Sequence, residues 1–111
     1  VLMTYGVKAG KISIEDMVRV ASSNTAKAFG LYPRKGVIAP GSDADIVLVD
    51  PDEEAVIDKD FYHCLCEVSI YEGWKVQGIA RTTILRGQVM MEDYETVGRP
   101  GTGRFLPCRA Y

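Results

Sequence analysis

The first part of the chain carries apolar residues at helical spacing. Four of them fall at positions i, i+3, i+4 and i+7 and would share one helix face: Ile14, Met17, Val18 and Ala21. This spacing predicts a helix over residues 14–21, with Ser13 placed to cap its first turn through a side-chain oxygen. Residues 1–10 are also rich in apolar positions and are expected to form the last turns of a helix that begins upstream.

A second short helix is predicted directly afterwards. Asn24 offers a side-chain cap for residues 25–29, and Gly30 stands where a left-handed residue would end the helix. We therefore expect two short helices that meet at Asn24. An apolar helix face of this kind needs a surface to cover it.

Beyond residue 36 the pattern changes to β-branched residues and alternation. The nearly continuous apolar run 46–49 predicts a strand covered on both faces, and Pro51 is expected to turn the chain away from it. Further strands are expected at 55–57, 78–85 and 88–92, with Arg86 and Gly87 forming a tight hairpin. The glycine-rich residues 98–104 suit an extended tail.

Length and charge restrict the class of protein. The 111 residues are enough for one modest domain but not for a (β/α)8 barrel of about 250 residues. Thirteen basic and 15 acidic residues give a net charge of −2, which provides no field to attract nucleic acid or a membrane surface. We find no spanning segment and no export signal. Three cysteines make a poor disulfide framework, so we expect a cytoplasmic protein.

Only one group of residues has the chemistry of a metal site. His63, Cys64 and Cys66 are zinc-type ligands, but the remaining cysteine, Cys108, lies far away and has no companion. In a strand Cys64 and Cys66 would share one face, as packed residues do. Ordinary packing is therefore the favoured interpretation, since free cysteines are frequently buried.

The other candidates for chemistry also have simpler explanations. Asp43 and Asp45 could act as paired carboxylates, but an aspartate at the entrance of a strand commonly accepts backbone amides. Capping explains Ser22 and Ser23, and the glycines at 98, 101 and 103 lack the strand and helix that a phosphate loop requires. The sequence therefore assigns no catalytic, cofactor-binding or metal-binding residue.

Residues 35–50 closely resemble the "kGxIxxGsdADivxxD" segment that follows the metal-dependent barrel in the amidohydrolase superfamily. Residues 22–36 resemble the "tStNpAklFgLyPrKG" run of dihydropyrimidinases and hydantoinases, with Thr25 in place of the usual proline. Landmarks at 71–73, 86–87 and 98–106 are similar to the "fEG", "RG" and "GxxGxGRyl" of that group. The resemblance covers nearly the whole chain in order.

The resemblance implies a fold class and a division of the chain. The class is α+β, with two short barrel-flanking helices followed by the C-terminal strands of a composite β-sandwich, an amidohydrolase fold without its barrel. Residues 1–35 would be the last barrel helices, residues 36–97 the C-terminal part of the sandwich, and residues 98–111 an extended tail. The remaining strands of the sandwich would come from the beginning of a longer enzyme.

The resemblance also implies a function for the longer protein. It would be a cyclic amidohydrolase whose two zinc ions are held by barrel residues preceding Val1, so His63 is not a ligand and the fragment alone is inactive. The implied partners are the rest of the parent enzyme and further copies, which form a tetramer in the family. Three alternatives stay open: an allantoinase parent, a dihydroorotase parent, and a non-catalytic scaffold similar to the collapsin response mediator proteins.

Overall fold

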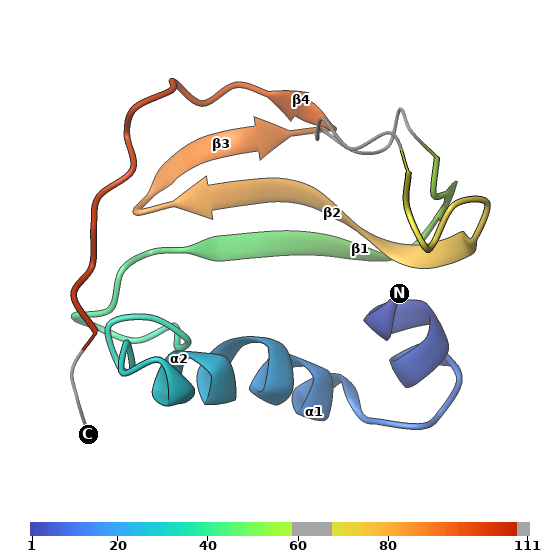
Figure 1. Cartoon of the computed structure of the whole chain (residues 1–111), viewed down its shortest axis with the longest axis horizontal. Coiled ribbons are helices and arrows are strands. Elements are labelled where there is room, and N and C mark those ends of the chain that lie inside the picture. Colours follow the sequence, from blue (N-terminus) through green and yellow to red (C-terminus); the bar gives the residue numbers. More distant parts are fainter. Residues whose placement is uncertain (59–67, 109–111) are drawn as a thin grey trace.

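The computed structural model describes residues 1–58 and 68–108 and has a helical part and a sheet part (Figure 1). The helical elements are η1 (Met3–Lys8), α1 (Ile14–Val18), η2 (Arg19–Asn24) and α2 (Thr25–Ala28). The strands are β1 (Ile46–Val56), β2 (Lys75–Leu85), β3 (Gln88–Glu92) and β4 (Glu95–Thr96), which form an open antiparallel sheet in the order β1-β2-β3-β4. The α+β class is therefore confirmed.

The helical residues 14–28 form one run rather than two capped helices. Ser13 caps its start as predicted, because its Oγ accepts a hydrogen bond from the amide of Asp16 at 3.0 Å. The predicted cap at Asn24 is wrong: its φ and ψ of −68° and −40° are helical, and its side chain makes no capping bond. The chain instead passes through the wide π-helical turn η2 without breaking. Gly30, with φ of 63°, follows the end of α2.

Strand β1 is longer than the sequence predicts. Pro51 does not turn the chain away, and the expected strands at 46–49 and 55–57 are largely one strand that ends at Val56. The register against β2 shifts between Asp50 and Glu54, so the proline lies in a bulge. Within that bulge the Asp50 carboxylate accepts the amides of Asp52 and Glu53 at 2.9 and 3.2 Å. The turn formed by the Asp50 carboxylate therefore lies within β1 and does not end the strand.

Two tight turns build the rest of the sheet. Arg86 and Gly87, with φ of 47° and 80°, join β2 to β3 and confirm the predicted hairpin. Asp93 and Tyr94 join β3 to β4 and also have positive φ, of 47° and 70°. The short strand β4 is not predicted by the sequence, because its two residues are too few for a period to be seen.

The buried core of the described residues is small. Its sheet part is a cluster of Ile57, Val76 and Ile79. The element η1 adds Met3, which packs so closely on Gly78 of β2 that a Cβ there would lie 2.2 Å from the Met3 Cγ. A Cα radius of gyration of 15.4 Å exceeds the about 13 Å of a compact domain of this length.

Much apolar surface is therefore left open. The run 46–49, predicted to be covered on both faces, has three exposed residues in the structure: Val47, Leu48 and Val49. The helical run lies on the β1 side of the sheet in Figure 1, and the tail after β4 passes down the side of the molecule toward α2. No helix in the described ranges is long and apolar enough to cross a membrane.

Candidate functional site

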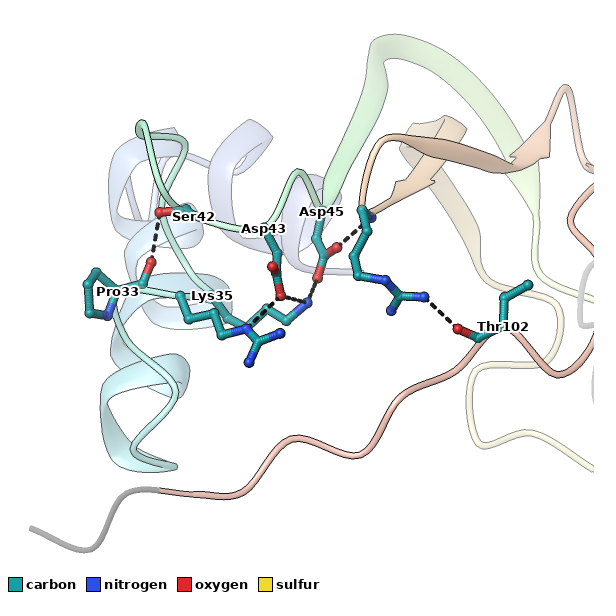
Figure 2. Close-up of polar contacts among 8 residues, drawn as sticks. Pro33, Lys35, Ser42, Asp43, Asp45 and Thr102 are labelled. Carbon is teal, nitrogen blue, oxygen red and sulfur yellow. Dashed lines mark hydrogen bonds and ion pairs between the residues drawn. The ribbon is translucent and has the colours of Figure 1, made fainter.

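The densest group of charges in the described chain lies between α2 and β1. Lys35 places its Nζ between two carboxylates, 2.9 Å from Asp43 Oδ2 and in direct contact with Asp45 Oδ2 (Figure 2). Arg34 Nε adds a third contact, 3.1 Å from the same oxygen of Asp43. We call these four residues, Arg34, Lys35, Asp43 and Asp45, the Lys35 cluster. The two carboxylates that the sequence singled out are therefore brought together on one ammonium group.

The loop from residue 33 to residue 45 holds these side chains in place. The Ser42 hydroxyl donates to the carbonyl of Pro33 at 2.8 Å (Figure 2). The amide of Asp43 donates to the carbonyl of Arg34 at 2.9 Å. Gly36 lets this loop lie against the helix, because a Cβ at its φ of 83° would be 2.6 Å from the Ala26 Cβ. The loop is thus closed on itself and packed onto α2.

The Lys35 cluster also connects to the sheet and to the tail. Asp45 Oδ1 accepts the backbone amide of Arg86 at 2.8 Å, as expected for an aspartate at a strand entrance. The Arg86 guanidinium donates to the carbonyl of Thr102 (Figure 2). The amide of Gly87 donates to the carbonyl of Ala44 at 3.0 Å. One network therefore joins the helix end, β1, the β2–β3 turn and the tail.

The electrostatics of the Lys35 cluster favour a structural role. The hydrogen bond from Lys35 lowers the pKa of Asp43, with Arg34 adding to the effect. Desolvation opposes a lowered pKa at Asp45, but the bonds from Lys35 and the Arg86 amide outweigh it. Lys35 is desolvated as well, and its two carboxylates still raise its pKa. At neutral pH all three groups are charged and compensated, so none is poised to transfer a proton.

A second polar cluster lies on the sheet and has no signal in the sequence. Arg81 of β2 contacts Glu53 Oε1 at 3.2 Å and Asp93 Oδ1 at 3.3 Å, and Tyr94 donates its hydroxyl to the same Glu53 oxygen. We call these four residues the Glu53 cluster. The bond to Glu53, together with desolvation, raises the pKa of the Tyr94 phenol. The other carboxylate oxygen, Glu53 Oε2, is buried and has no hydrogen-bond partner among the described residues.

The structure does not bring the other candidate residues from the sequence together in one site. His63, Cys64 and Cys66 lie outside the described residues, so their predicted packing is not tested. Cys108 is exposed, and the Ser23 hydroxyl donates to the carbonyl of Arg19 at 3.3 Å inside the helix. Within residues 1–58 and 68–108, no three His, Cys, Asp or Glu side chains come together to hold a metal ion.

A hollow beside these groups lies between the tail and the loop after α2. It has a volume of about 590 Å³, and its walls include Tyr32, Arg34, Asp43, Leu106 and Cys108. Arg34 and Asp43, which both line the hollow, are paired with each other.

Comparison with known proteins defines the class to which this arrangement belongs. Residues 1–90 match the amidohydrolase family, and the chain belongs to that family. Within it, the chain is 46% identical over 111 residues to a D-hydantoinase of Ralstonia pickettii, covering 99% of this chain and 24% of that protein. It is 44% identical over 102 residues to a dihydropyrimidinase of Dictyostelium discoideum, covering 92% and 20%.

Solved structures give the same result at the level of the fold. A D-hydantoinase structure superposes with a TM-score of 0.89 at 46% identity, over 92% of this chain and 22% of that one. A dihydropyrimidinase from Brevibacillus agri superposes with a TM-score of 0.91 at 39% identity, over 95% and 23%. The chain therefore has the fold of one part of a hydantoinase. It spans about a quarter of the length of these relatives.

Proposed function

We propose that the chain is the C-terminal part of a metal-dependent cyclic amidohydrolase of the hydantoinase and dihydropyrimidinase group, and that it supplies no catalytic residue. The observation that carries the proposal is the match of nearly the whole chain to about a quarter of a D-hydantoinase. In the Lys35 cluster no group is poised to act as an acid, base or nucleophile, which supports the proposal that the chain supplies no catalytic residue. The whole protein would hydrolyse a C–N bond of a cyclic amide.

The fold supports a particular place for the chain in that enzyme. Residues 1–35 would flank the barrel, residues 36–97 would form the C-terminal share of a composite β-sandwich, and residues 98–111 would be the tail. Exposed apolar residues on β1 are expected if further strands complete the sandwich. The partners would be the rest of the parent enzyme and further copies in a homo-oligomer. A cytoplasmic location belongs to the same proposal.

The binuclear zinc centre implied by the family does not fit the described residues of this chain. A catalytic zinc ion needs three protein ligands and an open position. Both carboxylates of the Lys35 cluster are already engaged by Lys35, and one also binds the Arg86 amide. We therefore assign the metal site to residues outside those described and derive no catalytic step from this part of the chain.

An activity assay and a gene sequence test the proposal. The isolated chain, supplied with zinc and given dihydrouracil or hydantoin, is expected to show no turnover. A metal-dependent rate would contradict the assignment of chemistry elsewhere. The coding sequence upstream of Val1 is expected to encode a His-x-His pair and a barrel lysine. Substitutions at those positions would instead favour a scaffold similar to the collapsin response mediator proteins.

A further inference from the structure

The tail after β4 leads from the edge of the sheet to the loop after α2 (Figure 1). At its start, the amide of Gly98 donates to the carbonyl of Met90 at 3.0 Å. In its middle, the carbonyl of Thr102 accepts a hydrogen bond from the Arg86 guanidinium. Near its end, Leu106 lines the hollow beside the loop after α2. The tail therefore contacts β3, the β2–β3 turn and the loop after α2 in succession.

Arg86 occupies a backbone position that does not suit an arginine. It forms a two-residue hairpin turn with Gly87, between the paired residues Leu85 and Gln88, and φ is positive at both turn residues, 47° and 80°. Such a turn favours Asn or Asp followed by Gly, because Asn and Asp tolerate a left-handed backbone better than other side chains do. Gly87 follows this preference and Arg86 does not. A residue held in a disfavoured conformation indicates a role for its side chain.

The guanidinium of Arg86 makes the contact that an asparagine could not make. Its Nη2 donates to the Thr102 carbonyl across 16 positions of sequence, in a partly buried contact. The Arg86 backbone amide is held separately by Asp45, whose carboxylate also binds Lys35. An asparagine would keep this backbone bond, but its side chain is too short to replace the far end of the arginine. The contact with the tail is therefore what distinguishes arginine from asparagine at this position.

The second attachment of the tail is made by Leu106. Leu106 is half-buried and lines the hollow of about 590 Å³ together with Tyr32 and Arg34. Its neighbour Phe105 is 90% exposed. The four residues from Thr102 to Leu106 span at most about 14 Å. A segment this short has little freedom when both of its ends are held.

We propose that residues 98–106, which we call the strap, fasten the loop after α2 to the β2–β3 turn, and that the bond from Arg86 to Thr102 holds the strap closed. Arg86 joins the two parts directly, because its amide is bound to Asp45 at the end of that loop and its guanidinium is bound to the strap. One side chain thus controls whether the strap is open or closed. The proposal concerns contacts within this chain and does not depend on the hydrolase assignment.

Two substitutions of Arg86 separate the strap from the turn. Both Arg86→Asn and Arg86→Met remove the bond to Thr102, so the backbone order parameters of residues 99–105, from NMR relaxation, should fall from above about 0.8 to below about 0.6. Trypsin should cut after Arg104 at least about tenfold faster in both variants. The urea midpoint should fall in Arg86→Met but change little in Arg86→Asn, because Asn suits the turn. Arg99→Asn, which removes an exposed tail charge, is the control and should leave the order parameters and the midpoint unchanged.

The second attachment gives an independent test in which the turn is untouched. Leu106→Ser should loosen residues 103–105, whereas Phe105→Ser, at the exposed neighbouring position, should not. Four results would overturn the proposal: a wild-type strap with order parameters below about 0.6, an Arg86→Asn chain whose strap stays as rigid as the wild type, an Arg86→Asn midpoint that falls as far as that of Arg86→Met, or equal loosening by Leu106→Ser and Phe105→Ser.

Discussion

The two polar clusters lie toward opposite ends of β1 and are built in different ways. The Lys35 cluster joins residues nine or ten positions apart in one loop, on a segment with a recognisable sequence motif. The Glu53 cluster joins Glu53 to Arg81, 28 positions later, and to Tyr94, 41 positions later. The sequence singles out two members of the first cluster, Asp43 and Asp45, and none of the second, whose residues meet only because the strands pair.

The difference predicts that the two clusters contribute differently to stability. The Lys35 cluster closes a loop onto α2 through Gly36 and also anchors the β2–β3 turn. The Glu53 cluster lies at a bulge, and one buried carboxylate oxygen in it has no donor within residues 1–58 and 68–108. A buried acceptor in that state costs free energy of folding. Damage near Lys35 is therefore expected to destabilise the chain more than damage near Tyr94.

The largest effect is expected from Gly36→Ala. The added Cβ would meet Ala26 Cβ at 2.6 Å and the carbonyl oxygen of Ser22 at 3.0 Å, in a backbone with positive φ. Strain and overpacking together should lower the free energy of unfolding by about 2–4 kcal/mol, measured by urea denaturation. Gly41→Ala is the control, because it has a φ of 89° but nothing within 4 Å. Equal losses from both variants would show that the close approach to α2 does not matter.

Lys35→Met should have the next largest effect. Lys35 and Asp43 are only 18% and 19% exposed, and removing the ammonium leaves Asp43 with Arg34 as its only cation and Asp45 with only the Arg86 amide. We expect a loss of about 1–2 kcal/mol in the free energy of unfolding, given the partial exposure of the pair. Adding Asp43→Asn and Asp45→Asn to Lys35→Met should recover part of this loss. No recovery in the triple variant would argue against charge compensation as the cause.

Acidification should weaken the same cluster without a substitution. The pKa values of Asp43 and Asp45 are lowered in the folded chain, so their stabilising effect is complete above the pKa of an unfolded aspartate and is lost as the pH falls below about 4. Denaturation midpoints measured between neutral pH and about pH 3 should therefore fall on the acid side. In the double variant Asp43→Asn, Asp45→Asn the denaturation midpoint should fall less between neutral pH and about pH 3 than in the wild type.

The smallest effect is expected from Tyr94→Phe in the Glu53 cluster. The substitution removes one hydrogen bond to Glu53 Oε1, while Arg81 still contacts that oxygen. A loss of about 0.5–1.5 kcal/mol in the free energy of unfolding is expected from thermal melts. A loss larger than that of Lys35→Met would reverse the order of the two clusters.

The sequence predicts local features of this fold well and long-range ones poorly. The Ser13 cap and the Arg86–Gly87 turn are decided by neighbouring residues, and both are confirmed. Two predictions failed: Asn24 was expected to separate two helices, and Pro51 was expected to end a strand. In the folded chain the helix continues through a wide turn, and pairing with β2 carries β1 past the proline.

The candidate site follows the same division. The sequence raised Asp43 and Asp45 as possible paired carboxylates but favoured aspartates that accept backbone amides at a strand entrance, and Asp45 does accept the Arg86 amide. Lys35 as the shared partner of the two carboxylates was not predicted, because its approach depends on the turn at Gly41 and the packing of Gly36 on α2. No signal in the sequence points to Glu53, Arg81 and Tyr94, since each is a common surface residue type at a position outside any motif.

The contact between Thr4 and Gln77 gives the molecule a built-in reporter. The Thr4 hydroxyl accepts from the Gln77 amide at 2.8 Å and donates to the Gln77 carbonyl at 3.0 Å, across 73 positions of sequence. The exchange rate of that one amide proton with solvent therefore depends on whether η1 is docked on β2. A single resonance in an NMR spectrum would follow the attachment of the first ten residues while the sheet itself stays intact.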